Sequence, residues 1–456
     1  MPAISKDNNL LVYKGSNFLR QRLLLSTLSG KPIRIIEIRS SEDEPGLKEY
    51  EICLIRLFDK VTNGTKVELS ETGTSIYYHP GIVIGGTFTH ECCVQRGIGK
   101  TQLKLELFRK WLFHRLTTSF FKSCVDFATV SSCCRISCIT FMFPLTLWIN
   151  TSILFDYKNA IELINNCLFP GYYLEILLAL GPFCKEPLNV TLRGITQSAT
   201  DVSVDRIKAA ACPILLKFIL VDDGLSLKVN KRGAPPLGGG EIHFTCPTRR
   251  LLRPLQWEKW GLVKRIRGVV FALRVSPAIA NRVVESSKGV MLNFLPDVYI
   301  NTDQYKGGAA GKSPGFGISL VAETNIGTFY SVPGPGVDNS VPEELGRKCA
   351  QGLLDEIYRG GTVDSAFQWL MALWMALGQK DVSKCVVGPL SDYTIAFLQH
   401  LKEFFGCTFK LEIAKSAGNG GEEADDSDDD DRPPGTQKVV FTCIGIGYSN
   451  ISKKTL

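Results

Sequence analysis

The chain has 456 residues, of which 45% are apolar and 21% are charged, so it is neither a disordered polymer nor a coiled coil, and its length suggests two or three domains. The net charge is +7, but residues 422–431 hold eight acids and no base, which leaves +15 on the remainder. A basic body of this kind indicates an anionic partner such as RNA, although solvated lysines would give the same sum.

The 15 cysteines are scattered along the chain. A disulfide framework is typical of short secreted chains, so this pattern favours a reducing compartment. No pair of ligand motifs stands at zinc spacing, and we expect no structural metal site. The polar N-terminus, Met1 to Asn9, has no apolar signal core.

Residues 100–170 form an anomalous insert. From Thr101 to Pro170 there is no glycine, yet these residues hold 9 of the 25 phenylalanines. Gly99-Lys100 can be encoded with a splice-donor sequence, and Phe169-Pro170-Gly171 with an acceptor in the same codon phase. We interpret the insert as a retained intron, whose removal leaves 384 residues. A lineage-specific insertion and a membrane span within the uncharged run Ile136 to Phe155 are the alternatives.

Outside the insert, strand and helix patterns recur three times along the chain. Glu51 to Val61 and Val204 to Phe218 are predicted to form equivalent helices, and Tyr393 to Phe405 a helix of the third copy. The sequence therefore predicts an α/β fold with three repeats in one large domain and a smaller inserted α/β domain. The predicted limits are 8–99, 171–255 and 341–454 for the repeats, 256–340 for the inserted domain, and 416–436 for a disordered acidic loop.

The most specific motif begins at Arg232 and contains Gly238, Gly239 and Gly240. Consecutive glycines let backbone N–H groups approach an anion, and an arginine adds a forked donor. With its flanking residues, the motif resembles the signature of RNA 3′-terminal phosphate cyclases. Further stretches agree in order: Asn17 to Gly30, Pro45-Gly46-Leu47, Leu320 to Thr324, Gly360 to Asp364, Gly388-Pro389 and Cys443 to Asn450.

The departures from this family concern its catalytic positions. The resemblance places the nucleophilic histidine at Tyr393 and an Asp-Gln pair at Trp369-Leu370. A tyrosine is a poor nucleophile at neutral pH, and the latter two side chains cannot position nucleotide or metal. The family's Glu-Gly-Gly-Gly-Gln corresponds to Tyr13 to Asn17, and a loop arginine corresponds to Glu42. We expect no catalytic residue and no cofactor.

This pattern is similar to the cyclase-like branch of the family. That resemblance implies a nuclear, nucleolar protein of the small-subunit processome, which binds pre-rRNA and a large ribosome-biogenesis GTPase and is needed for pre-18S rRNA processing. It implies no membrane and no small-molecule substrate. An endoribonuclease role in pre-rRNA cleavage, or residual cyclase activity, stays open as an alternative.

Several residues are candidates for binding RNA or another anion. Arg20, Arg232 and the three glycines match the family's phosphate-binding cleft. Gly311-Lys312-Ser313 resembles the end of a P-loop, but position 306 is lysine where that motif needs glycine. Lys306 and Lys312 are therefore weaker candidates, as are Lys264, Arg265 and Arg267 in a second basic cluster. Ser427, within the acidic run, is a candidate for phosphorylation by an acidophilic kinase.

Overall fold

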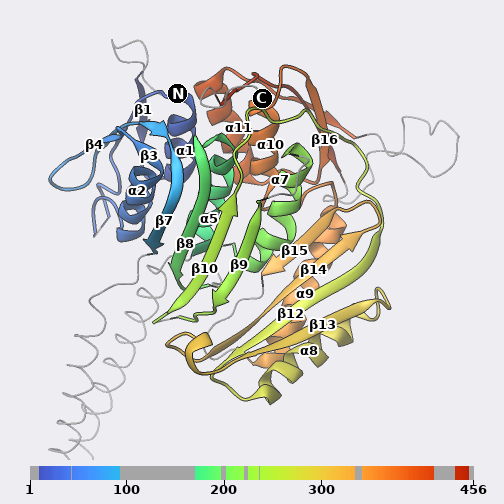
Figure 1. Ribbon diagram of the computed structural model, residues 1–456. Helices are drawn as coiled ribbons and strands as arrows, with labels where there is room; N and C mark the ends of the chain where they lie inside the picture. Colours follow the sequence, from blue (N-terminus) through green and yellow to red (C-terminus); the bar gives the residue numbers. More distant parts are fainter. Residues whose placement is uncertain are drawn as a thin grey trace, which may run out of the picture. The chain divides into compact units, whose positions relative to one another are not determined.

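The computed structural model describes residues 10–42, 44–92, 170–196, 202–219, 224–235, 237–333, 341–414 and 437–450. All of them belong to one of the two units into which the chain divides (Figure 1). The anomalous insert at 100–170, apart from Pro170, and the acidic loop at 416–436 lie outside the described residues. The retained-intron interpretation, the membrane-span alternative and the Ser427 site therefore stay predictions.

Three four-stranded sheets correspond to the three predicted repeats with two exceptions: the strand Gly85–Glu91, from the predicted first repeat, joins the second sheet, and the strand Gln256–Trp257, from the predicted inserted domain, joins the third. The first has the order β1 (Leu11–Lys14), β2 (Ile33–Ile36), β5 (Ile76–His79), β4 (Lys66–Leu69). The second has the order β7 (Gly85–Glu91), β8 (Glu186–Gly194), β10 (Gly240–Cys246), β9 (Ser226–Lys231). The third has the order β11 (Gln256–Trp257), β16 (Val382–Val387), β18 (Val439–Ile444), β17 (Lys410–Ile413). A short ladder joins β3 (Thr62–Asn63) to β6 (Ile82–Val83).

Helices from all three repeats share one hydrophobic core with these sheets. They are α1 (Leu19–Ser29), α2 (Glu49–Val61), α5 (Pro170–Leu180), α6 (Val204–Arg206), α7 (Cys212–Ile219), α10 (Gln368–Leu377) and α11 (Asp392–Phe405). Every residue of α10 is buried, because the helix carries no charged side chain and can be enclosed on all sides. In Figure 1 the second sheet lies in front of α5 and α7, and its other face is turned toward the viewer.

A fourth sheet has its own core. Its order is β13 (Val298–Tyr305), β12 (Val263–Leu273), β14 (Gly315–Thr324), β15 (Phe329–Pro333), and α8 (Pro277–Met291) packs on it. The predicted limits 341–454 for the third repeat include the segment that follows β15. In the structure this segment forms the helix α9 (Pro342–Arg359), which places Leu345 and Leu353 in the core of the fourth sheet.

The α/β class, with three repeats and an inserted α/β module, is thereby confirmed. None of the helices among the described residues combines the length and the apolar character needed to cross a bilayer.

Candidate functional site

Arg20 lies at the centre of a cluster formed by four helices. From α1, its Nη1 lies 2.5 Å from Oε2 of Glu175 on α5, and its Nη2 donates a 2.9 Å hydrogen bond to the hydroxyl of Tyr393 on α11. The guanidinium carbon is 4.7 Å from the centre of the Tyr172 ring and 5.7 Å from that of Trp369 on α10. We call these five residues the Arg20 cluster. Its aromatic faces enclose the cation while Glu175 balances its charge.

Burial sets the electrostatics of the Arg20 cluster. The side chain of Glu175 is only 1% exposed, and this desolvation raises the pKa of its carboxyl, while the charge of Arg20 lowers it. Burial also raises the pKa of the Tyr393 hydroxyl, again against an opposing effect of Arg20. The phenol is therefore protonated at neutral pH, and its oxygen already accepts from the guanidinium. An uncharged hydroxyl in this state is a weak nucleophile.

Apolar side chains occupy the positions at which the resemblance places the family's Asp-Gln pair. Trp369 and Leu370 are 1% and 0% exposed. The Trp369 ring meets the rings of Tyr393 and Phe397 edge-on, with centroids 5.9 Å and 5.3 Å away. Neither residue brings a carboxylate or an amide side chain to the region, so these positions offer nothing with which to ligate a metal or orient a polyphosphate.

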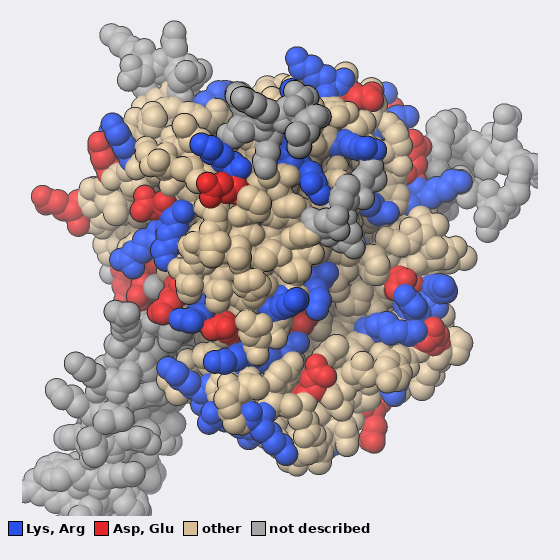
Figure 2. All heavy atoms as spheres, in the orientation of Figure 1, with Lys and Arg blue, Asp and Glu red and all other residues tan. Residues whose placement is uncertain are grey.

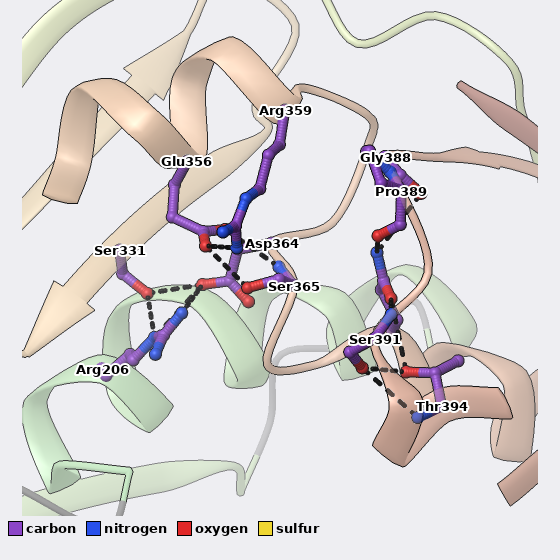
Figure 3. A network of polar contacts seen from close by, with 11 residues as sticks. Arg206, Ser331, Glu356, Arg359, Asp364, Ser365, Gly388, Pro389, Ser391 and Thr394 are labelled. Carbon is purple, nitrogen blue, oxygen red and sulfur yellow. Dashed lines mark hydrogen bonds and ion pairs between the residues drawn. The ribbon is translucent and has the colours of Figure 1, made fainter. Parts of the chain in front are cut away.

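A polar network fixes the turn before α11, the helix that carries Tyr393, and Figure 3 shows Gly388, Pro389, Ser391 and Thr394 of this network on its right-hand side. The Gln368 amide donates to the carbonyl of Pro389 at 3.1 Å, and its oxygen accepts from the backbone N–H of Ser391 at 3.3 Å. The Ser391 hydroxyl caps α11 by accepting from the N–H of Thr394. The Gly388-Pro389 turn and the start of α11 are thus fixed against α10. Tyr393 is the second residue of α11, so its backbone is fixed with them.

A second network surrounds Asp364, at the left of Figure 3. Its Oδ2 accepts from the Ser331 hydroxyl at 2.7 Å and from Arg206 Nη2 at 3.3 Å. Burial raises the pKa of Asp364 and Arg206 lowers it. The Glu356 carboxylate accepts hydrogen bonds from the hydroxyl and the backbone N–H of Ser365, which follows Asp364 in the chain. Because Arg206 belongs to α6, Ser331 to β15 and Asp364 to the segment before α10, this network joins the second repeat, the fourth sheet and the third repeat.

The sequence indicates Asp364 as part of a motif, but it does not indicate its partners Arg206 and Ser331. It likewise does not indicate Glu175 and Tyr172 as the partners of Arg20. Arg206 and Asp364 are 158 residues apart, and no periodicity marks either residue as one of a pair. Only the spacing of the family motifs could have drawn attention to this region.

The structure places Arg232 apart from the Arg20 cluster. Its guanidinium makes two hydrogen bonds to Asp205, at 2.7 Å and 2.8 Å, and lies 4.7 Å from the centre of the Phe271 ring. Its side chain is 4% exposed. Both arginines of the predicted phosphate-binding surface are therefore already paired with a carboxylate. Their role in binding RNA stays a prediction.

The glycine motif and the lysine loop, which lie far apart in the sequence, are in direct contact. The N–H of Gly311 donates to the carbonyl of Arg232 at 2.6 Å, and that of Lys312 donates to the carbonyl of Gly238 at 2.9 Å. Gly238 and Gly239 have φ values of +63° and +85°, and a Cβ on Gly240 would lie 2.6 Å from a methyl carbon of Thr196. The positive φ explains glycine at positions 238 and 239, the lysine loop further crowds Gly239, and the close approach of Thr196 explains glycine at position 240.

The second basic cluster is largely neutralised. Arg265 pairs with Glu323 and Arg267 with Asp297, each at 2.7 Å, whereas Lys264 is exposed. These residues lie near the first end of β12, and Lys306 and Lys312 lie beyond its last residue. Among the residues that the structure describes, no three histidine, cysteine, aspartate or glutamate side chains are grouped to hold a metal ion.

Comparison with known proteins defines the class to which this fold and site belong. The model of the RNA 3′-terminal phosphate cyclase family matches residues 11–113 and 156–411, so the chain belongs to that family. The unmatched residues 114–155 lie within the anomalous insert.

Individual relatives narrow this likeness to the cyclase-like proteins. The chain is 48% identical to the probable RNA 3′-terminal phosphate cyclase-like protein of Drosophila melanogaster, over 100% of both chains. It is 44% identical to the RNA 3′-terminal phosphate cyclase-like protein of Homo sapiens, over 97% of both. It is 34% identical to the rRNA processing protein rcl1 of Schizosaccharomyces pombe, again over 97% of both.

Proposed function

We propose that this protein acts in pre-18S rRNA processing and 40S ribosome biogenesis, as a cyclase-like protein without 3′-phosphate cyclase activity. The Arg20 cluster is the observation that carries this proposal. Where a cyclase needs an accessible nucleophile, the chain has a protonated Tyr393 whose oxygen accepts from Arg20. The relative from fission yeast that is named an rRNA processing protein supports the assignment to ribosome assembly.

The chemistry of adenylylation argues against cyclisation. A nucleophile must attack the α-phosphate of ATP while pyrophosphate leaves, and groups nearby must hold the polyphosphate and its metal. Tyr393 would have to lose a proton whose pKa is raised. Trp369 and Leu370 then supply neither a carboxylate nor an amide. The character of Tyr393, Trp369 and Leu370 therefore supports the proposal that no covalent adenylate forms.

We further propose that the protein works in the nucleolus by binding pre-rRNA, components of the small-subunit processome and a large ribosome-biogenesis GTPase. The basic charge of the chain outside the acidic run supports an RNA partner. The identity of the GTPase partner and the nucleolar location rest on the family resemblance. No cofactor, membrane or small-molecule substrate is part of the proposal.

Four measurements test this function, two with cells or nuclear extract and two with the purified chain. In cells depleted of the endogenous protein, expression of the chain should restore pre-18S rRNA processing, and capture from nuclear extract should recover a GTPase and pre-rRNA. Incubation of the purified chain with labelled ATP should give no covalent adenylate, and an RNA with a 3′-phosphate should stay uncyclised. A labelled protein band, or processing that is unaffected by depletion, would contradict the proposal.

A further inference from the structure

Four basic side chains lie around the two joined glycine loops. Lys231 ends β9, directly before Arg232, whose N–H donates to the carbonyl of Ala309. Lys306 and Lys312 flank that segment. Arg274 follows β12, and its N–H donates to the carbonyl of Tyr305, the residue before Lys306. These backbone contacts bring Lys231, Arg274, Lys306 and Lys312 to one edge of the molecule, and we call them the basic rim.

All four side chains of the basic rim are exposed. None of them takes part in an ion pair among the described residues, in contrast to Arg20, Arg232, Arg265 and Arg267. Nearby carboxylates are already engaged: Asp205 binds Arg232, and Glu241 accepts from Arg193 at 3.1 Å. Lys231 stands opposite Glu241 in the strand register, whereas Arg274, Lys306 and Lys312 add positive charge for which the described residues supply no ion-pair partner. Figure 2 shows Lys and Arg side chains gathering at the end of the fourth sheet that adjoins β9 and β10.

The backbone of the rim is open as well as basic. Nothing lies within 4 Å of the position of a Cβ on Gly307 or Gly308, and both residues are exposed. A polyanion can therefore approach the main chain between Lys306 and Lys312, where glycine N–H groups add to the lysine charges. On the buried side, the contacts of Gly311 and Lys312 with the glycine motif hold the loop in position.

We propose that the basic rim binds the phosphate backbone of single-stranded RNA, and that Arg20 and Arg232 act as structural cations behind it. This inference rests on the proposed function and names the surface that would carry it. Lysine ammonium groups bind phosphates as point charges, which suits a flexible backbone. Because no rim side chain is aromatic, stacking on bases does not contribute, and binding is expected to show little sequence preference. An acidic peptide would normally also need a buried apolar anchor, and among the described residues of these loops Leu237 is the large apolar side chain that is exposed.

The test compares two variants of the full chain that lose the same charge. The rim variant changes Lys231, Arg274, Lys306 and Lys312 to Gln. The distal variant changes Lys66, Lys185, Lys380 and Lys402 to Gln; these lysines are exposed, take part in no ion pair among the described residues and lie outside the two glycine loops. Thermal unfolding first establishes that both are folded. A single Lys306→Glu variant serves as a second probe, because a substitution on this exposed loop should leave the free energy of unfolding nearly unchanged.

Binding of a fluorescent single-stranded RNA is measured by anisotropy at several salt concentrations. The rim variant should lose at least about tenfold in affinity, and its log–log salt slope should fall by roughly 0.7 for each phosphate contact removed. The distal variant should stay within about twofold of the unchanged chain, and Lys306→Glu should weaken binding in the same direction as the rim variant.

Three results would overturn the inference: unchanged RNA binding by the rim variant, an equal loss in the distal variant, or loss of binding to polyglutamate with RNA binding intact. The last would assign the rim to an acidic protein segment. Because the assay needs only purified chain and RNA, it is independent of the cellular test. A chain that binds RNA through the rim yet fails to restore pre-rRNA processing would contradict the proposed function alone.

Discussion

Arg20 and Tyr393 are 373 residues apart in sequence, yet the guanidinium of the first donates a 2.9 Å hydrogen bond to the hydroxyl of the second. Glu175 balances the charge of Arg20 from a third helix. The position at which the family resemblance places a nucleophile therefore takes part in a contact among the helices of the three repeats. We infer that this contact contributes to stability.

Substitution of Arg20 by alanine tests this structural role. Removing the guanidinium leaves the Glu175 carboxylate buried without its partner, which typically costs about 3–5 kcal/mol of unfolding free energy. The measurement is urea-induced unfolding followed by circular dichroism. Arg265→Ala is the control, because its pair with Glu323 is partly exposed and should contribute at most about 1 kcal/mol. Equal effects of the two substitutions would show that the Arg20 pair adds nothing beyond a surface ion pair.

Restoring the family histidine should not restore the family reaction. In Tyr393→His, an imidazole would stand beside Arg20, but Trp369 and Leu370 would still lack groups that hold a nucleotide or its metal. We expect no labelled protein after incubation with α-labelled ATP and denaturing electrophoresis. A cyclase that retains its histidine serves as the positive control. A labelled band in the variant would mean that the tyrosine alone suppresses adenylylation.

Two buried histidines predict a loss of stability in mild acid. Burial, followed by nearby Lys60 and Arg56, lowers the pKa of His90 to about 4, and burial, followed by Arg22, lowers that of His400 to about 4. In the unfolded chain both titrate near pH 6.5. The unfolded state therefore binds more protons between these values, so stability is full above pH 6.5 and falls as the pH drops toward 4.

The size of this effect is on the order of 3 kcal/mol for each histidine, if the whole shift is realised. Urea unfolding at a series of pH values measures it. His400→Gln should weaken the pH dependence between about pH 6.5 and 4, because the remaining shifted histidine is then His90. Carboxylates titrate in both proteins, and the comparison cancels them. The same slope in both would show that His400 does not contribute.

The described residues on either side of the anomalous insert predict that the shorter chain folds. A Cβ on Gly194 would lie 3.1 Å from Cβ of Cys92 and 3.3 Å from Cδ of Pro170, so the ends of β7 and α5 meet at one residue of β8. A Cβ at Gly171 would collide with the carbonyl oxygen of Val202. In the 384-residue chain, Gly99 directly precedes Tyr172 and preserves glycine at that position.

We expect amplification across the junction to yield a transcript that lacks the insert. The 384-residue chain should also be more soluble than the 456-residue chain and unfold cooperatively. Expression of both forms in parallel provides the comparison. Recovery of only the long transcript would refute the retained-intron interpretation, and an insoluble short chain would show that the insert is needed for folding.

The sequence by itself determined the α/β class, the family and the chemical character of the catalytic positions. The sequence predicts a helix over Tyr393 to Phe405, and the structure has α11 at Asp392–Phe405. Such elements are predictable because hydrophobic periodicity and helix caps are local signals. The family resemblance matches Tyr393, Trp369 and Leu370 to the family's catalytic positions, because the spacing of motifs is also a local property of the sequence.

Only the tertiary structure decided which charges are available to a ligand. A net charge counts every lysine and arginine alike, although Arg20 and Arg232 are neutralised by Glu175 and Asp205. The basic rim likewise depends on contacts between loops that are far apart in sequence. Electrostatic pairing is set by proximity in space, and burial makes it strong by removing water. Neither the distance between two charged side chains nor their burial produces a periodic pattern or a motif spacing in the sequence.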